Sequence, residues 1–245
     1  MPVLPVVLEG IKQCLFEPPV EALAGFALRN PDLFGLVADV MLAAYHPGDF
    51  DDDLWERFVL IYSLEPSRAC ALRALLVDFY ACNKTKTLND RRGKLLERVL
   101  WECTPRNATH NVMDKGRKCR LKDRSGNVLG CSGHDFDIAL LGVQAFEGYE
   151  CKARVDNFLG GRTQDKPKSK HLAKLAYMCR VKSDLIGLGF NAHVFLAGYD
   201  KSMNHAHSIL ARYQFAEIEL LSSRDIRDMI VTARGRQVAQ PAEGL

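Results

Sequence analysis

The chain has 245 residues and 47% of them are hydrophobic, which is enough to bury one large core or two modest ones. No apolar run approaches the ~20 residues that a membrane-spanning helix needs. Glu9 and Lys12 interrupt the N-terminal apolar stretch, so a secretory signal is not expected either. We therefore expect a soluble, cytoplasmic protein with no membrane partner.

Charge divides the chain into two parts of opposite sign. Residues 1–83 carry five Lys and Arg against twelve Asp and Glu, a balance of −7, whereas residues 84–245 carry 28 against 18, a balance of +10. The two balances sum to the net charge of +3. This asymmetry indicates that the C-terminal part meets a polyanion while the N-terminal part has another role.

The acidic part has the pattern of an all-helical domain over residues 1–83. Residues 19–29 begin with a proline and end with an arginine, and Asn30 and Pro31 start the next of four or five helices. The acidic run 49–53 is expected to cap a helix at the positive end of its dipole. A calcium loop is the alternative, but the run lacks the ligand spacing of an EF-hand. The domain could hold a homodimer, dock a protein partner, sense a ligand or cap the C-terminal part.

We place a polar linker at residues 84–90, a second domain at 91–233 and a disordered tail at 234–245. The loop 156–169 is rich in glycine and lysine and is expected to grip a substrate. The helix 170–185 is expected to point Lys170, Lys174 and Lys182 outward. The other elements expected in the second domain are helices at 91–103, 203–213 and 222–230 and strands at 191–199 and 217–221.

A basic ladder precedes the centre of this domain. A turn at Ser125-Gly126-Asn127 separates two strand-like runs and predicts a hairpin. Like charges on one strand face repel each other, so a phosphate backbone is the attractive partner, although an exposed strand kept soluble by charge is the alternative. The residues that alternate onto this face are Lys118, Arg120, Lys122 and Arg124.

The segments His134–Leu141 and Gly148–Ala153 are the centre of the domain, and both have the pattern of short strands that pair as a hairpin. Alternation places Asp135 and Asp137 on one face of the first strand, and Glu150 and Lys152 on one face of the second, with the apolar residues on the opposite, buried face. Three carboxylates and an amine would then converge. A hard cation such as Mg²⁺ is the natural ligand for such a group.

These residues resemble the active-site signature of the PD-(D/E)XK nucleases, the restriction-endonuclease-like superfamily. Asp137 lies at the end of a strand, and Glu150-Cys151-Lys152 follows on the next. The resemblance covers about residues 90–232 and implies an α/β fold with an αβββαβ core, a mixed sheet flanked by helices, preceded here by the all-α domain. It also implies metal-dependent phosphodiester cleavage.

The resemblance further implies roles for single residues. Asp137 and Glu150, with the backbone carbonyl of Cys151, would hold Mg²⁺, or Mn²⁺ as a substitute, and Lys152 would orient or deprotonate the attacking water. The pattern Gly93-x-x-x-Glu97 on the preceding helix is similar to one that contributes a further metal-site glutamate, with Glu102 as a competitor. Asp135 is expected to be a further ligand, a supporting group, or the replacement for Asp137 in another strand register.

We expect DNA rather than RNA as the partner and a phosphodiesterase activity that is endonucleolytic. An alternative is a nucleic-acid-binding or assembly protein on the same fold with little hydrolysis. The residues expected to contact nucleic acid are Lys118, Arg120, Lys122, Arg124, Arg154, Arg162, Lys170 and Lys174.

The cysteines suggest a third class of function. The eight cysteines form no Cys-x-x-Cys pair and are expected to be reduced, mostly buried thiols. The alternative is a zinc or iron–sulfur module, although such sites usually contain closely spaced ligand pairs. The residues that would build it are Cys103, His110, Cys119, Cys131 and His134; His205 and His207 are expected to lie on the surface.

Overall fold

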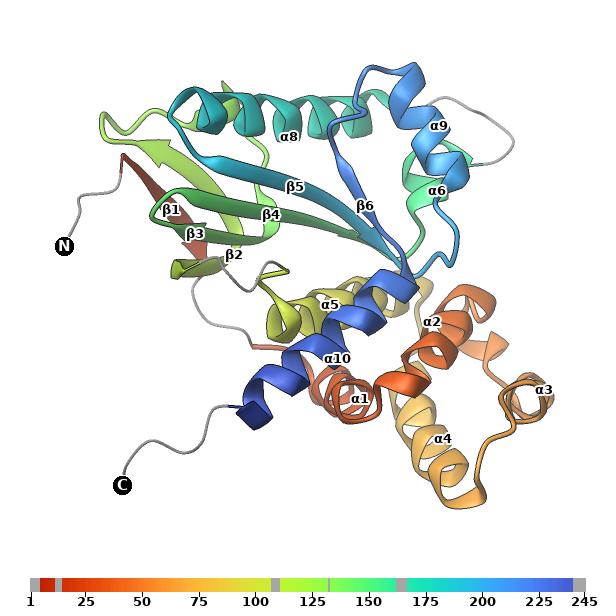
Figure 1. The fold of residues 1–245 in the computed structure, drawn as a ribbon. Helices are drawn as coiled ribbons and strands as arrows, with labels where there is room; N and C mark the ends of the chain where they lie inside the picture. The colour runs from red at the N-terminus through yellow and green to blue at the C-terminus, as the bar shows by residue number, and fades with distance from the viewer. Residues whose placement is uncertain (1–4, 12–14, 107–110, 132, 162–166, 240–245) are drawn as a thin grey trace. The chain divides into compact units, whose positions relative to one another are not determined.

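The computed structural model describes residues 5–11, 15–106, 111–131, 133–161 and 167–239 (Figure 1). The chain is an α/β protein that forms two compact units. The first, which we call the sheet unit, comprises residues 1–14, 105–198 and 202–222. The second, which we call the helical unit, comprises residues 15–104, 199–201 and 223–245.

The helical unit confirms the helices expected in the acidic part. Prolines occupy the first turns of α1 and α4, where the missing amide hydrogen costs nothing. Asp51 caps α3 by accepting the Leu54 amide at 2.8 Å, so the acidic run 49–53 serves helix capping as predicted. The helices are α1 (Pro18–Arg29), α2 (Phe34–Ala43), α3 (Asp52–Tyr62), α4 (Pro66–Tyr80), α5 (Thr85–Cys103) and α10 (Ser223–Ala239).

The boundaries of the two units differ from the predicted ones. Residues 91–104 and 223–233, which were predicted to belong to the second domain, lie in the helical unit. Residues 85–90, predicted as a linker, form the first turns of α5. Residues 234–239, predicted as part of a disordered tail, continue α10. Residues Val6–Ile11, assigned to the helical domain, form strand β1 and pair with a strand more than a hundred residues later. Local sequence cannot reveal such long-range pairing, because the hydrogen bonds come from a distant segment.

The sheet unit contains a six-stranded mixed sheet with the strands in sequence order. The strands β1 to β4 are antiparallel, and β5 and β6 then run parallel to their neighbours. The predicted central hairpin is confirmed as β3 paired with β4, and the basic turn forms with a single bridge between Lys122 and Val128. The strands are β1 (Val6–Ile11), β2 (Val112–Asp123), β3 (Phe136–Gly142), β4 (Ala145–Lys152), β5 (Asn191–Gly198) and β6 (Glu219–Leu221).

Helix α8 (Ser169–Gly187) lies along one face of this sheet (Figure 1). Its Met178 and Val181 belong to one core cluster with Phe136, Phe146 and Leu196 of the strands. The short helix α6 (Val155–Phe158) and helix α9 (Asn204–Arg212) add residues to the same core. None of the helices described in either unit is long and apolar enough to cross a membrane.

Burial of β3 is more complete than predicted. We expected one buried and one polar face, but all seven residues of the strand are buried. A charged side chain on this strand therefore needs partners that offset the cost of removing it from water. Asp137 is the charged residue on β3, which makes its surroundings informative.

Gly148 fixes the distance between β4 and the aromatic core. A Cβ atom at this position would lie 2.7 Å from Cε1 of Phe136 and 2.9 Å from Cε1 of Phe146. We expect Gly148→Ala to lower the free energy of unfolding by about 1–3 kcal/mol, because ring atoms must move in a close-packed core. Chemical denaturation measures this change. Gly187→Ala is the matched control, since nothing lies within 4 Å of its Cβ, and an equal loss in both variants would contradict the packing argument.

Candidate active site

Asp137 and Glu150 lie opposite each other on neighbouring strands. The register pairs Ile138 with Tyr149 and Ala139 with Gly148, so the next position brings Asp137 opposite Glu150. Both residues are buried, each with 4% of its surface exposed. Oδ2 of Asp137 accepts the amide hydrogen of Cys151 at 2.7 Å, so a side chain satisfies a main-chain donor at this end of the hairpin. The predicted convergence of these two carboxylates is present.

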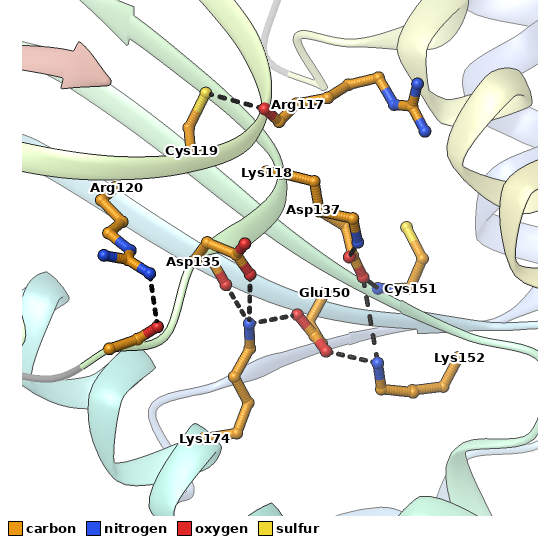
Figure 2. A network of polar contacts seen from close by, with 11 residues as sticks. Arg117, Lys118, Cys119, Arg120, Asp135, Asp137, Glu150, Cys151, Lys152 and Lys174 are labelled. Carbon is orange, nitrogen blue, oxygen red and sulfur yellow. Dashed lines mark hydrogen bonds and ion pairs between the residues drawn. The ribbon is translucent and has the colours of Figure 1, made fainter. Parts of the chain in front are cut away.

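Three lysines surround the carboxylates (Figure 2). Lys118, on β2, donates to Oδ1 of Asp137. Lys152 donates to Oε1 of Glu150, and its Nζ lies 4.0 Å from Oδ2 of Asp137. Nζ of Lys174, on α8, lies 2.7 Å from Oε2 of Glu150. Each carboxylate is thus in contact with two ammonium groups, which is the compensation that buried charge requires.

The charges of these groups stabilise one another. Burial alone would raise the pKa of Asp137, but the positive charges of Lys152 and Lys118 outweigh it and hold that pKa below its ordinary value. Burial alone would lower the pKa of Lys152, but the carboxylates of Glu150 and Asp137 raise it above its ordinary value. Asp137 is therefore ionised and Lys152 protonated at neutral pH. In this state Lys152 can donate a proton or a hydrogen bond but cannot act as a base.

An aromatic side chain also contacts Lys152. Its Nζ lies 5.2 Å from the ring centroid of Phe158 on α6, within the range of a cation–π contact. The imidazole of His171 stacks on the same ring at 4.3 Å. The amine is therefore fixed by a carboxylate and a ring face together, which restricts the positions that its hydrogens can reach.

Asp135 lies just before β3 rather than on it. Its side chain is 37% exposed, and its Oδ1 lies 3.7 Å from Nζ of Lys174. Its main-chain oxygen also accepts a hydrogen bond from that amine. Asp135 and Glu150 thus both contact Lys174. In the observed strand register Asp137, not Asp135, lies opposite Glu150 on β4, so Asp135 does not replace Asp137.

Glu97 is buried on α5 in the helical unit, with 7% of its surface exposed. Its predicted part in a metal site stays a prediction. Its competitor Glu102 forms an ion pair with Arg98 on the same helix. The carbonyl of Cys151 likewise stays a predicted ligand, while its amide is bound by Asp137.

The donor set at this site fits a hard divalent cation. Asp137 and Glu150 supply two buried carboxylates, and Mg²⁺ typically uses one or two carboxylates and completes its shell with carbonyl oxygens and water. Among the residues described, no three His, Cys, Asp or Glu side chains are grouped as a metal site. His110 and the side chain of Cys131, two members of the alternative Cys/His module, lie outside the description.

The basic ladder on β2 is present, but its members have protein partners. Lys118 contacts Asp137, Arg120 donates to the carbonyl of Gly133 at 2.9 Å, and Lys122 pairs with Glu9 at 2.8 Å. Arg124 is exposed in the turn that follows the strand. Of the other residues expected to contact nucleic acid, Lys170 is exposed near the start of α8, Arg154 precedes α6, and Arg162 lies outside the described residues.

The prediction that Lys174 points outward is wrong. It is buried, with a side chain that is 10% exposed, and it contacts Glu150. The signal was present in the sequence: positions 174, 178, 181 and 185 recur at helical spacing, and Met178, Val181 and Leu185 are buried with it. A lysine within an apolar stripe indicates a buried partner of opposite charge.

Comparison of the sequence with models of known protein families found no match, and a search of curated proteins found none either.

Proposed function

We propose that the protein is a metal-dependent nuclease that hydrolyses phosphodiester bonds, of DNA rather than RNA, at the site formed by Asp137, Glu150 and Lys152. The observation that carries the proposal is the position of Lys152, whose amine contacts Glu150 and lies 4.0 Å from Asp137. Two buried carboxylates supply negative charge for a cation, and the protonated amine beside them supplies positive charge for the oxygens of a phosphate. Mg²⁺ is the cofactor of this proposal, with Mn²⁺ as a substitute.

The charge of each residue determines its proposed role. When bound by Asp137 and Glu150, the cation would offset charge on the scissile phosphate and lower the pKa of the attacking water. Lys152, protonated and fixed between Glu150 and Phe158, would orient the attacking water or donate to the developing charge. Lys174 would keep Glu150 in position from the helix side.

The order of elements also supports the proposal. Helix α5 precedes β2, β3 and β4, which are antiparallel, and helix α8 then leads to β5, which runs parallel to β4. This agrees with the αβββαβ order expected from the PD-(D/E)XK resemblance. The carboxylates lie on the central strands of that order, β3 and β4, where the resemblance places the catalytic residues.

A second function has one observation in its favour. Each carboxylate of the site is already in contact with a lysine, so the group could be a structural network in a nucleic-acid-binding or assembly protein. Such a protein would bind nucleic acid without cutting it. The two functions differ in a single measurable property, which is hydrolysis in the presence of a divalent metal.

The test is a cleavage assay of the purified protein on circular duplex DNA, circular single-stranded DNA and RNA, each with Mg²⁺, Mn²⁺ or EDTA. Circular substrates reveal endonucleolytic cutting, since they offer no ends. We expect cutting of DNA with either metal and none with EDTA. Binding of all three substrates without cutting would favour the second function, and cutting that persists in EDTA would contradict a metal-dependent mechanism.

A further inference from the structure

The charges at the candidate active site cancel within the protein. Three carboxylates, those of Asp135, Asp137 and Glu150, are in contact with three lysines. Adding a divalent cation to such a balanced, largely buried group is costly unless an existing positive charge leaves. One of the lysines should therefore be the group that a cation displaces.

Exposure identifies which lysine can leave. The side chain of Lys118 is 41% exposed, against 30% for Lys152 and 10% for Lys174. Lys152 is also held by the ring of Phe158, and Lys174 joins Glu150 to Asp135. Of the three ammonium groups, that of Lys118 therefore belongs to the side chain most accessible to water.

The backbone at Lys118 has an unusual conformation. Its φ is +50°, which is rare for a residue with a side chain and commonly marks functional positions. Arg117 pairs with Ile138 and Cys119 with Phe136, so Lys118 lies directly across from Asp137. The strained position therefore directs the lysine to the carboxylate.

Strand β1 supports this backbone from the outer side. A Cβ on Gly10 would lie 2.8 Å from the carbonyl oxygen of Lys118 and 2.8 Å from Cα of Cys119. The pairing of β1 with β2 shifts its register between Glu9 and Ile11, at the same point. The N-terminal strand thus packs closely on the backbone that carries Lys118, and only glycine fits at that contact.

We propose that Lys118 acts as a built-in cation, which holds the Asp137 carboxylate in the metal-free protein and releases it when a divalent cation binds. The inference rests on the proposed function for the identity of the cation site, but it concerns metal affinity rather than cleavage. The released ammonium group would lie on the face of β2 that also carries the half-exposed Arg120 and Lys122, where a phosphate could reach it. Lys118 is in this account a positioning residue that sets how tightly the site binds metal.

The test is calorimetric titration of the metal-free protein with MnCl₂. We expect Lys118→Met to lower the Kd for Mn²⁺ by about tenfold or more. In the wild type Mn²⁺ must compete with the Lys118 ammonium for the Asp137 carboxylate, and an ion pair in contact changes such a binding equilibrium by at least about that factor. The metal-free variant should also have a lower Tm than the wild type and gain more from Mn²⁺. Lys118→Asn gives the same test with a residue that tolerates positive φ.

Two controls separate displacement from a general effect of charge. Lys182→Met removes one charge from α8, where Lys182 donates to the carbonyl of Glu217, and it should leave the Kd unchanged. Lys118→Arg keeps the cation and should bind Mn²⁺ as the wild type does. An unchanged or higher Kd in Lys118→Met, an equal gain in Lys182→Met, or no Mn²⁺ binding by any variant would overturn the proposal. If Lys118→Met binds Mn²⁺ more tightly but the wild type cuts no DNA, the displacement of Lys118 by metal would be supported and the proposed nuclease function would be contradicted.

Discussion

Asp137→Asn is expected to reduce metal-dependent cleavage by at least about a thousandfold while the protein still folds. The substitution removes one of the two buried carboxylates that would bind the cation. A bound metal stabilises the transition state by several kcal/mol, and each 1.36 kcal/mol that is lost slows the reaction about tenfold. Folding should survive because the side-chain oxygen of asparagine can still accept the hydrogen bond from the main-chain amide of Cys151, which Asp137 accepts at 2.7 Å in the wild type. Single-turnover cleavage and chemical denaturation measure the two effects.

The matched variant Asp137→Ala separates charge from hydrogen bonding. Alanine also leaves the amide of Cys151 without its side-chain acceptor, which should cost about 1–3 kcal/mol more of unfolding free energy than asparagine does. Both variants should be equally inactive. Cleavage by the asparagine variant within tenfold of the wild-type rate would remove Asp137 from the mechanism.

Lys152→Met is expected to lower the cleavage rate by about 10²–10⁴-fold and to change DNA affinity by no more than a few-fold. The methionine keeps an apolar stem beside the ring of Phe158 but lacks the amine that contacts Glu150. Because the loss should fall on the chemical step, the rate at saturating DNA should drop while the Kd for DNA is retained. Fluorescence anisotropy and single-turnover kinetics give the two quantities separately.

Two outcomes would change the account of Lys152. An unaltered cleavage rate would show that the amine has no part in the reaction. A large loss of DNA affinity with an unaltered rate at saturation would make Lys152 a binding residue, in line with the second function. Lys182→Met, with one charge removed from the same unit, should behave as the wild type in both assays.

The sequence predicted the centre of the sheet unit well because its signals are local. Alternation along 134–141 and 148–153, with glycines between, predicted a hairpin, and β3 and β4 form one. The same alternation placed Asp137 and Glu150 together. Helices α1 to α4 also followed from local features, namely prolines at their starts and an acidic cap at Asp51.

Contacts between distant segments could not be predicted in this way. The pairing of β1 with β2, the contact of Lys118 with Asp137 and the burial of Lys174 against Glu150 each join segments that are separate in the chain. The two lysines looked like surface residues because lysine is rarely buried without a partner, and the partners are set by the fold. One practical consequence is that a truncation before residue 84 would also remove β1, and with it the packing of Gly10 on Lys118.

The measurement that tests the central claim most directly is cleavage of circular DNA by the wild type, Lys152→Met and Lys182→Met in one Mg²⁺ buffer, with EDTA as the blank. We predict that the wild type and Lys182→Met cut at equal rates, and that Lys152→Met and the EDTA samples leave the DNA intact. Intact circles with the folded wild type in Mg²⁺ and in Mn²⁺, or cutting by Lys152→Met at the wild-type rate, would contradict the account.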